Sequence, residues 1–146
     1  MKSIVKAKAV FIALTVTLAL SSPAQSETGC AHDDFYSFLV DFQNNPSEQE
    51  SMSADQIEMT RIQEMGRAMP ARYTQTQSKN DLDWPILPSL TELNQQDLRV
   101  RIYQDKPSKA ELYASAMDGR EVYLMWHFEK DTCWTFVGFT DGTLHR

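Results

Sequence analysis

The fold is decided by residues 122–141, V-Y-L-M-W-H-F-E-K-D-T-C-W-T-F-V-G-F-T-D. Large apolar residues recur at every second position on either side of the polar pair Lys130-Asp131. A period of two is typical of a strand with one buried face, because successive side chains point to opposite faces of a sheet. The stretch therefore predicts two antiparallel strands joined by a two-residue turn at Lys130-Asp131.

This turn sets an expected register, in which Phe128 pairs with Cys133 and facing residues point to the same side of the sheet. The core face is then predicted to carry Val122, Leu124, Trp126, Phe128, Cys133, Thr135, Val137 and Phe139. The opposite face carries Tyr123, Met125, His127, Trp134 and Phe136. Because this second set is unusually aromatic for a solvent side, we predict that it binds a ligand or a partner.

Two more strands are expected upstream of this pair. Residues 98–103 alternate between aliphatic and other side chains, and the run 112–116 ends at the hairpin signal Asp118-Gly119. The register of this second hairpin stays open. A three-residue loop with a bulge puts Leu112 and Ala114 on the core face, whereas a two-residue turn puts Tyr113 and Ser115 there.

The first half of the mature chain is expected to be helical. The stretch from His32 to Asn45 predicts a helix, because its apolar residues are spaced i, i+3, i+4 and i+7. These residues are Phe35, Phe38, Leu39 and Phe42. A second helix is expected from Ser53 to Met69, where Ser53-Ala54-Asp55-Gln56 has the spacing of a capping box. Four residues share its expected apolar face: Met59, Ile62, Met65 and Met69.

The rest of the middle is expected to be mostly irregular. The polar stretch from Tyr73 to Asp83 predicts an exposed loop, and Ser89-Leu90-Thr91-Glu92 predicts a short helix that starts with a capping box. Together these elements predict an α+β fold, with N-terminal helices packed on a C-terminal four-stranded antiparallel meander.

The two ends of the chain resemble the nuclear transport factor 2-like (cone fold) superfamily, in particular its small exported bacterial domains. The resemblance is carried by F-Y-S-F-L-V-D-F (35–42) and by Y-L-M-W-H-F-E-K-D-T-C-W-T-F-V-G-F-T-D-G-T-L (123–144). It implies a cone-like sheet wrapped on helices around a pocket, a scaffold that hosts both enzymes and binding modules. It assigns no catalytic residue, because no acid–base motif of the superfamily is present.

The N-terminus predicts export. Lys2, Lys6 and Lys8 precede the apolar run A-V-F-I-A-L-T-V-T-L-A-L (9–20), and small residues follow up to Ser26. An apolar run of this length fits a secretory signal peptide and is too short for a permanent membrane anchor. We therefore expect residues 1–26 to be a signal peptide cleaved near Ser26. Residues 27–146 are expected to form one periplasmic or secreted domain with no stable membrane anchor.

Export bears on the two cysteines, Cys30 and Cys133. In an oxidising compartment an even pair favours a structural disulfide. The alternative, a reactive thiol activated by His127, requires both sulfurs to stay unpaired.

Charge and motifs exclude several classes of function. The 146 residues carry 14 Lys and Arg against 20 Asp and Glu, and removing the signal peptide leaves 11 against 20. So acidic a domain does not favour nucleic acid as a partner, whereas a small ligand or a basic envelope protein suits it. The sequence has no nucleotide-binding loop, metal motif or nucleophile motif, so we expect no cofactor and no metal.

His127 is the one residue that we single out for chemistry. An imidazole in an aromatic recess is a candidate general base, although the spacing assigns it no carboxylate partner. The sequence therefore favours an exported, non-catalytic binding module for a small ligand or a protein. The alternatives are a small cofactor-free enzyme of the isomerase or dehydratase kind that uses His127, and an inhibitor that neutralises a basic toxin or hydrolase.

Overall fold

The computed structural model describes residues 29–63, 70–118, 120 and 122–143. The expected signal peptide and its cleavage site lie outside the described residues, as do Met65 and Met69 of the expected second helix. Within the described part of the chain, no helix is long and apolar enough to cross a membrane.

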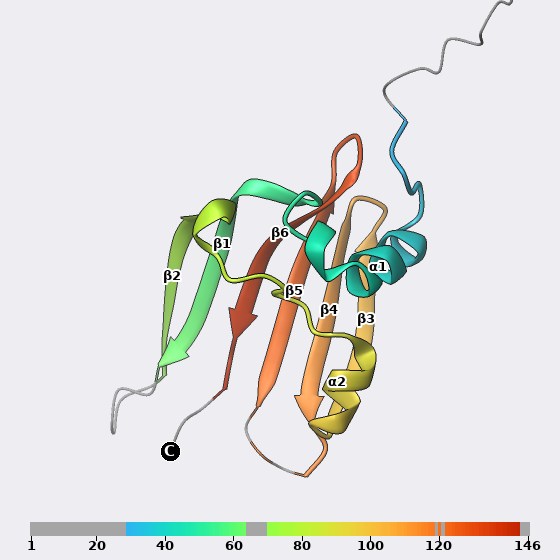
Figure 1. Cartoon of the computed structure of the whole chain (residues 1–146). Coiled ribbons are helices and arrows are strands. Elements are labelled where there is room, and N and C mark those ends of the chain that lie inside the picture. Colours follow the sequence, from blue (N-terminus) through green and yellow to red (C-terminus); the bar gives the residue numbers. More distant parts are fainter. Residues whose placement is uncertain (1–28, 64–69, 119, 121, 144–146) are drawn as a thin grey trace, which may run out of the picture.

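Six strands form one mixed sheet in the order β2-β1-β6-β5-β4-β3. They are β1 (Ser53–Gln63), β2 (Ala71–Ser78), β3 (Leu98–Lys106), β4 (Lys109–Ala116), β5 (Tyr123–Lys130) and β6 (Trp134–Asp141). Neighbours run antiparallel except β1 and β6, which run parallel. The helices α1 (Phe35–Asn44) and α2 (Leu90–Gln95) lie on one face of the sheet (Figure 1). We call this the covered face and the opposite side the outer face.

The predicted fold class is wrong. The sheet has six strands rather than four, and its β1–β6 pair is parallel, so it is not an antiparallel meander with helices before it. In place of the cone-like arrangement of N-terminal helices that we expected, the described residues before β1 form one α-helix, α1, and a 3-10 turn (Pro46–Glu48), and α2 lies between β2 and β3.

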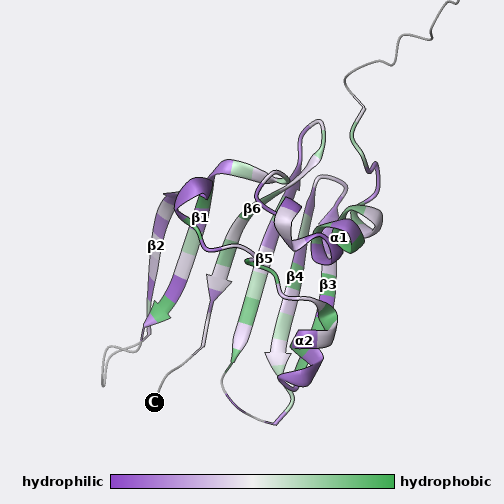
Figure 2. Cartoon of the chain, in the orientation of Figure 1, coloured by the Kyte–Doolittle hydropathy of each residue, from purple (hydrophilic) through white to green (hydrophobic). Residues whose placement is uncertain are grey.

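The error lies in the middle of the chain. The expected helix from Ser53 to Met69 is the strand β1 up to Gln63, and the expected loop contains the strand β2. In β1, Ile57 and Thr60 are buried, and β-branched side chains of this kind fit a pleated surface. Figure 2 shows β2 almost entirely in hydrophilic colours, which is why its sequence reads as a loop. It is nonetheless a strand, because it pairs with β1 along eight positions.

The helix α1 packs through the apolar stripe that its sequence predicts. Its first turn is capped by Asp34, whose carboxylate accepts a hydrogen bond of 2.8 Å from the backbone N–H of Ser37. That bond lowers the pKa of Asp34 below its usual value. The stripe contacts aromatic residues of the sheet, with ring centroids 5.2 Å apart between Phe35 and Phe128 and 5.9 Å apart between Phe42 and Phe136. Aromatic burial of this extent contributes much of the core energy of a small domain.

The expected register of β5 and β6 is also wrong. Phe128 pairs with Phe136 rather than with Cys133, and Val137 is an extra residue in β6 that forms a bulge. The turn has three residues, Asp131, Thr132 and Cys133, because Lys130 pairs with Trp134. Cys133, which is bonded to Cys30, therefore lies outside β6. Trp134 and Phe136 consequently point into the core. Past the bulge the alternation resumes with Gly138 and Thr140 on the outer face and Phe139 against the core.

The open register of the middle hairpin is settled by the pairing of β4 and β5. Leu112 pairs with Trp126 and Ala114 pairs with Leu124. Leu112, Ala114 and Trp126 are all buried, so the core face is the one expected for a three-residue loop. The register itself is neither of the two expected ones, because the backbone N–H of Ala116 donates to the carbonyl of Val122 and Ser115 pairs with Tyr123. Tyr113 and Ser115 are therefore on the outer face.

The predicted disulfide is confirmed. Cys30 and Cys133 are bonded, with their Cα atoms 5.3 Å apart and a separation of 103 positions in the sequence. The bond ties the chain just before α1 to the turn just before β6. It therefore holds the helix over the two strands that its phenylalanines contact.

A buried amide holds the segment between β2 and α2 against the sheet. The side chain of Gln49 is fully buried. Its Oε1 accepts hydrogen bonds from the backbone N–H groups of Ile86 (3.0 Å) and Leu87 (3.1 Å). Its Nε2 donates a hydrogen bond to the carbonyl of Leu87 (2.8 Å). The indole N–H of Trp126 donates to the carbonyl of Ile86 at 3.0 Å. The predicted short helix follows as α2, with Ser89 and Glu92 forming the expected capping box.

Removing the disulfide should destabilise the domain strongly. Replacing both cysteines, Cys30→Ser with Cys133→Ser, frees a loop of about 100 residues in the unfolded chain, which costs about 4–5 kcal/mol in the chain-entropy model. Chemical denaturation of the double variant and of reduced, alkylated wild type should give the same loss. An unchanged midpoint in the double variant would show that the bond contributes nothing.

Gln49→Met should cost about 2–4 kcal/mol of unfolding free energy, because a thioether leaves buried backbone groups of Ile86 and Leu87 without partners. Urea denaturation measures the loss. The matched control is Gln95→Met on the exposed side of α2, for which we expect a change within about 0.5 kcal/mol. Equal stabilities of the two variants would contradict a role for Gln49.

Candidate functional site

The structure brings together only part of the predicted binding surface. Tyr123, Met125 and His127 lie on the outer face, all half-buried. Trp134 and Phe136 are in the core, 4% and 0% exposed, and so cannot contact a ligand on that face. The three outer residues come from β5, and their neighbours are supplied by β4 and β6.

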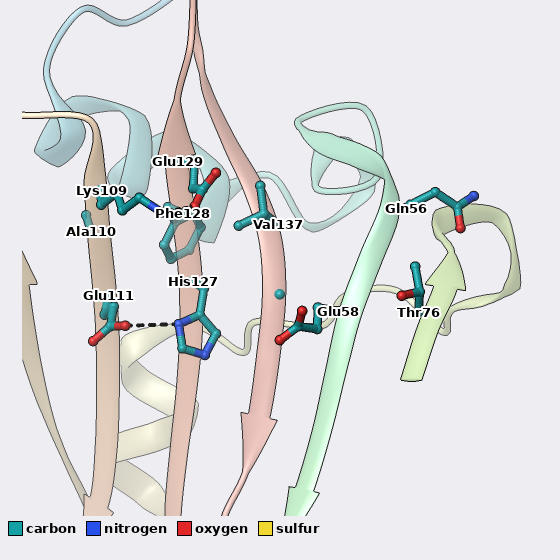
Figure 3. A pocket seen from close by; sticks show the side chains of 11 residues that line it. Gln56, Glu58, Thr76, Lys109, Ala110, Glu111, His127, Phe128, Glu129 and Val137 are labelled. Atoms are coloured by element: carbon teal, nitrogen blue, oxygen red, sulfur yellow. Dashed lines mark hydrogen bonds and ion pairs between the residues drawn. The ribbon is translucent and has the colours of Figure 1, made fainter. Parts of the chain in front are cut away.

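A groove of about 480 Å³ crosses the outer face around His127. In Figure 3 the helices lie behind the strands, which shows that this groove is on the side away from them. Its polar lining consists of Gln56, Glu58, Thr76, Lys109, Glu111, His127 and Glu129. It therefore spans strands β1, β2, β4, β5 and β6, with β6 contributing Val137 and Gly138.

His127 is held on both sides of its ring. Its Nδ1 is 3.1 Å from Oε1 of Glu111, the residue directly opposite it on β4, and its Nε2 is 2.9 Å from Oγ1 of Thr140. An ionised carboxylate only accepts hydrogen bonds, so in the neutral ring Nδ1 carries the proton. Nε2 then accepts from the Thr140 hydroxyl. The ring is fixed in one orientation and one tautomer.

Gly138 forms the floor between His127 and Glu58. A Cβ at this position would lie 3.5 Å from Cδ2 of His127 and 3.0 Å from the carbonyl oxygen of Glu58. Because glycine has no side chain, the space between the imidazole and the Glu58 carboxylate stays open (Figure 3). The glycine therefore gives the groove its depth.

The groove is lined by more acidic than basic side chains. Lys109 donates to Glu129 at 2.5 Å, and this contact raises the pKa of Lys109 above its usual value. Glu111 is engaged by His127. Within the described part of the chain, the Glu58 carboxylate has neither an ion pair nor a hydrogen bond, so its acceptor capacity is free.

This arrangement is better suited to binding than to known nucleophilic chemistry. Glu111, His127 and Thr140 are connected in the order acid, imidazole, hydroxyl, as in a catalytic triad. However, Thr140 is 4% exposed, so its hydroxyl is not accessible to a substrate. Among residues 29–63, 70–118 and 122–143, no group of three His, Cys, Asp or Glu is placed to hold a metal ion.

The sequence missed Glu111, Glu58 and Thr140. Glu111 opposes His127 only in the register that pairs Leu112 with Trp126, and the sequence left that register open. Glu58 lies in β1, where a helix was expected, and Thr140 reaches His127 only in the observed register of β5 and β6, which differs from the expected one. His32, just before α1, lies outside this site, and its Nε2 is 2.9 Å from Oδ2 of Asp41.

Comparison with known proteins identifies no relative of this chain. No protein-family model matches the chain, and no curated protein is similar to it. The resemblance to the nuclear transport factor 2-like superfamily therefore stays a prediction.

His32 and His127 should adopt opposite tautomers when neutral. Long-range ¹H–¹⁵N NMR should show the Nδ1–H form for His127, because Glu111 accepts from Nδ1, and the Nε2–H form for His32, because Asp41 accepts from Nε2. His32 serves as the internal control. Glu111→Gln should lower the Nδ1–H preference of His127 and leave His32 unchanged. An Nε2–H form of His127 in the wild type would contradict the network.

Proposed function

We propose that the protein is an exported, non-catalytic binding module that holds a small ligand or a side chain of a protein partner in the groove around His127. The observation that carries this proposal is the groove itself. It lies on a face that α1 and α2 leave open, its imidazole is oriented by Glu111 and Thr140, and the carboxylate of Glu58 is free to accept. An oriented set of polar groups around an open cavity is typical of ligand sites.

Export is supported by the disulfide between Cys30 and Cys133. Disulfides persist in oxidising compartments such as the periplasm or the extracellular space and are rare in the cytosol. The sequence of residues 1–26, with its basic start and apolar run, agrees with this location. A mature domain in the periplasm meets both small metabolites and other envelope proteins.

The charge of the groove favours a partner that donates hydrogen bonds or carries positive charge. The whole chain has a formal charge of −6, and the groove holds three glutamates against one lysine. A basic side chain of an envelope protein would pair with Glu58, the carboxylate that has no partner among the described residues. Inhibition of a basic toxin or hydrolase is one form that such binding takes, since complementary charge speeds encounter.

Catalysis is a second candidate, favoured by one observation. The Glu111–His127 pair is the arrangement that orients a general base, which an isomerase or dehydratase requires. The contact of Nε2 with Thr140 opposes it, because that nitrogen has to be free to take a proton from a substrate. The substitution His127→Gln separates the two functions, since an amide retains hydrogen bonding but cannot transfer protons at neutral pH.

A thermal-shift screen of the disulfide-bonded protein tests the binding function. Small amines, guanidines, neutral metabolites and lysine-rich peptides are the probes. A ligand present at 100 times its Kd should raise the unfolding free energy by about 2.7 kcal/mol. Glu58→Gln and His127→Ala should abolish the shift, because they remove the negative charge of the free carboxylate and the oriented ring.

The control is Asp81→Asn, an exposed acidic residue outside the groove, which should keep the full shift. Shifts that survive both groove substitutions, or that Asp81→Asn removes equally, would contradict a site at His127. An absence of any shift across the probes would count against the binding function as a whole.

A further inference from the structure

Three tyrosines form a diagonal line on the outer face, beside the groove. Tyr103 of β3, Tyr113 of β4 and Tyr123 of β5 contact in sequence, with ring centroids 6.4 Å and 6.0 Å apart. Each ring is one strand over and two residues along from the next. We call this set the tyrosine ladder. Tyr103 is 49% exposed and the other two are half-buried, so ring surface and hydroxyls remain accessible.

The ladder is held rigidly at its inner end. The ring of Tyr123 lies directly over Gly142, where a Cβ would come within 1.9 Å of Cζ. The backbone N–H of Gly142 also donates to the carbonyl of Tyr123 at 2.9 Å. Only glycine permits so close an approach of ring to backbone. The first ring is fixed in this way; Tyr113 packs against it at an interplanar angle of 31°, and Tyr103, on the edge strand β3, meets Tyr113 edge-on at 67°.

Two arginines flank the ladder on the same face. Arg101 lies directly opposite Tyr113 on β3, and Arg99 lies opposite Ser115, two residues along. Both are exposed, and neither is in an ion pair with any described residue. Glu111, the carboxylate nearest along β4, is directed to His127 instead. The guanidinium groups are therefore free to bind carboxylates, which they hold with two parallel hydrogen bonds.

We propose that the tyrosine ladder, with Arg99 and Arg101, binds a glycan chain that carries carboxylate groups. Tyrosine offers an apolar ring face and a polar hydroxyl together, which matches a sugar ring with its C–H face and its hydroxyls. A line of aromatic rings suits a linear chain of such rings, and the two arginines pair with the acid groups. The proposal rests on the proposed binding function but uses a different surface from the groove.

A single-stranded nucleic acid would also stack on aromatic rings, but the charges of the molecule disfavour it. Nucleic acids carry one phosphate per nucleotide and are held by an extended basic track. Here the ladder has two free arginines on a chain of formal charge −6. The Cys30–Cys133 disulfide also favours an oxidising compartment, where glycans rather than nucleic acids are the abundant polymers.

Calorimetric titration of the disulfide-bonded protein tests the proposal. The probes are oligomers of galacturonic acid, the matched neutral galactose oligomers and oligothymidylate. We expect the galacturonate oligomers to bind, with an affinity that falls as salt is added. Removal of one stacked ring or one ionic contact, by Tyr103→Ala or Arg101→Gln, should weaken binding about tenfold or more, by analogy with base stacking on aromatic side chains.

The controls are Tyr73→Ala and Arg61→Gln. These residues pair with each other across β1 and β2 and line a separate cavity that the ladder residues do not share, so both variants should bind as wild type does. Circular dichroism confirms folding of each variant; Tyr103 and Arg101 are exposed on an edge strand, so their replacement leaves the core intact.

The proposal is overturned if galacturonate oligomers give no heat, if galactose oligomers bind as tightly, or if oligothymidylate binds more tightly. It is equally overturned if Tyr103→Ala and Arg101→Gln bind as wild type does. Since Glu58 and His127 are outside the ladder, a groove ligand found in the thermal-shift screen would survive these outcomes. Failure of the glycan site is thus distinguished from failure of the proposed binding function.

Discussion

The burial of the α1 phenylalanines against β5 and β6 is the contact on which the rest of the structure depends. Phe35, Phe38 and Phe42 all contact Phe128, at the centre of the sheet. The disulfide holds the start of the helix there, and Gln49 holds the segment before α2 on the same side. Every large aromatic contact of the core is thereby made on one face. The outer face carries polar residues and tyrosines, and both candidate sites, the groove around His127 and the tyrosine ladder, therefore lie on it.

The sequence predicts the parts of the fold whose periodicity is strong. The stripe from Phe35 to Phe42, the capping box at Ser89 and the disulfide are all found as expected. The strands β1 and β2 were missed for opposite reasons. In β1, apolar residues at Met59 and Ile62 satisfy a helical period as well as a strand pairing. In β2, hardly any residue is apolar, since this edge strand buries little of its surface.

The candidate site was predicted only through His127, because its other members depend on register. Glu111 and Thr140 are 16 and 13 positions from His127, and they reach it only once three strands are aligned. A period of two assigns residues to faces but does not tell which residues oppose each other. Turn length decides that, and the turn before β6 has three residues rather than the two that the local pair Lys130-Asp131 indicates.

The bulge at Val137 keeps the two halves of β6 in step with β5. Before the bulge, Phe136 points inward, and after it Phe139 still reaches the core while Thr140 turns to His127. Regular pairing straight through Val137 would exchange the two sides of the strand beyond it, expelling Phe139 into solvent and sealing the threonine inside. A deletion of Val137 itself would leave both halves opposite the same residues of β5, whereas a deletion elsewhere between Trp134 and Asp141 would break that alignment.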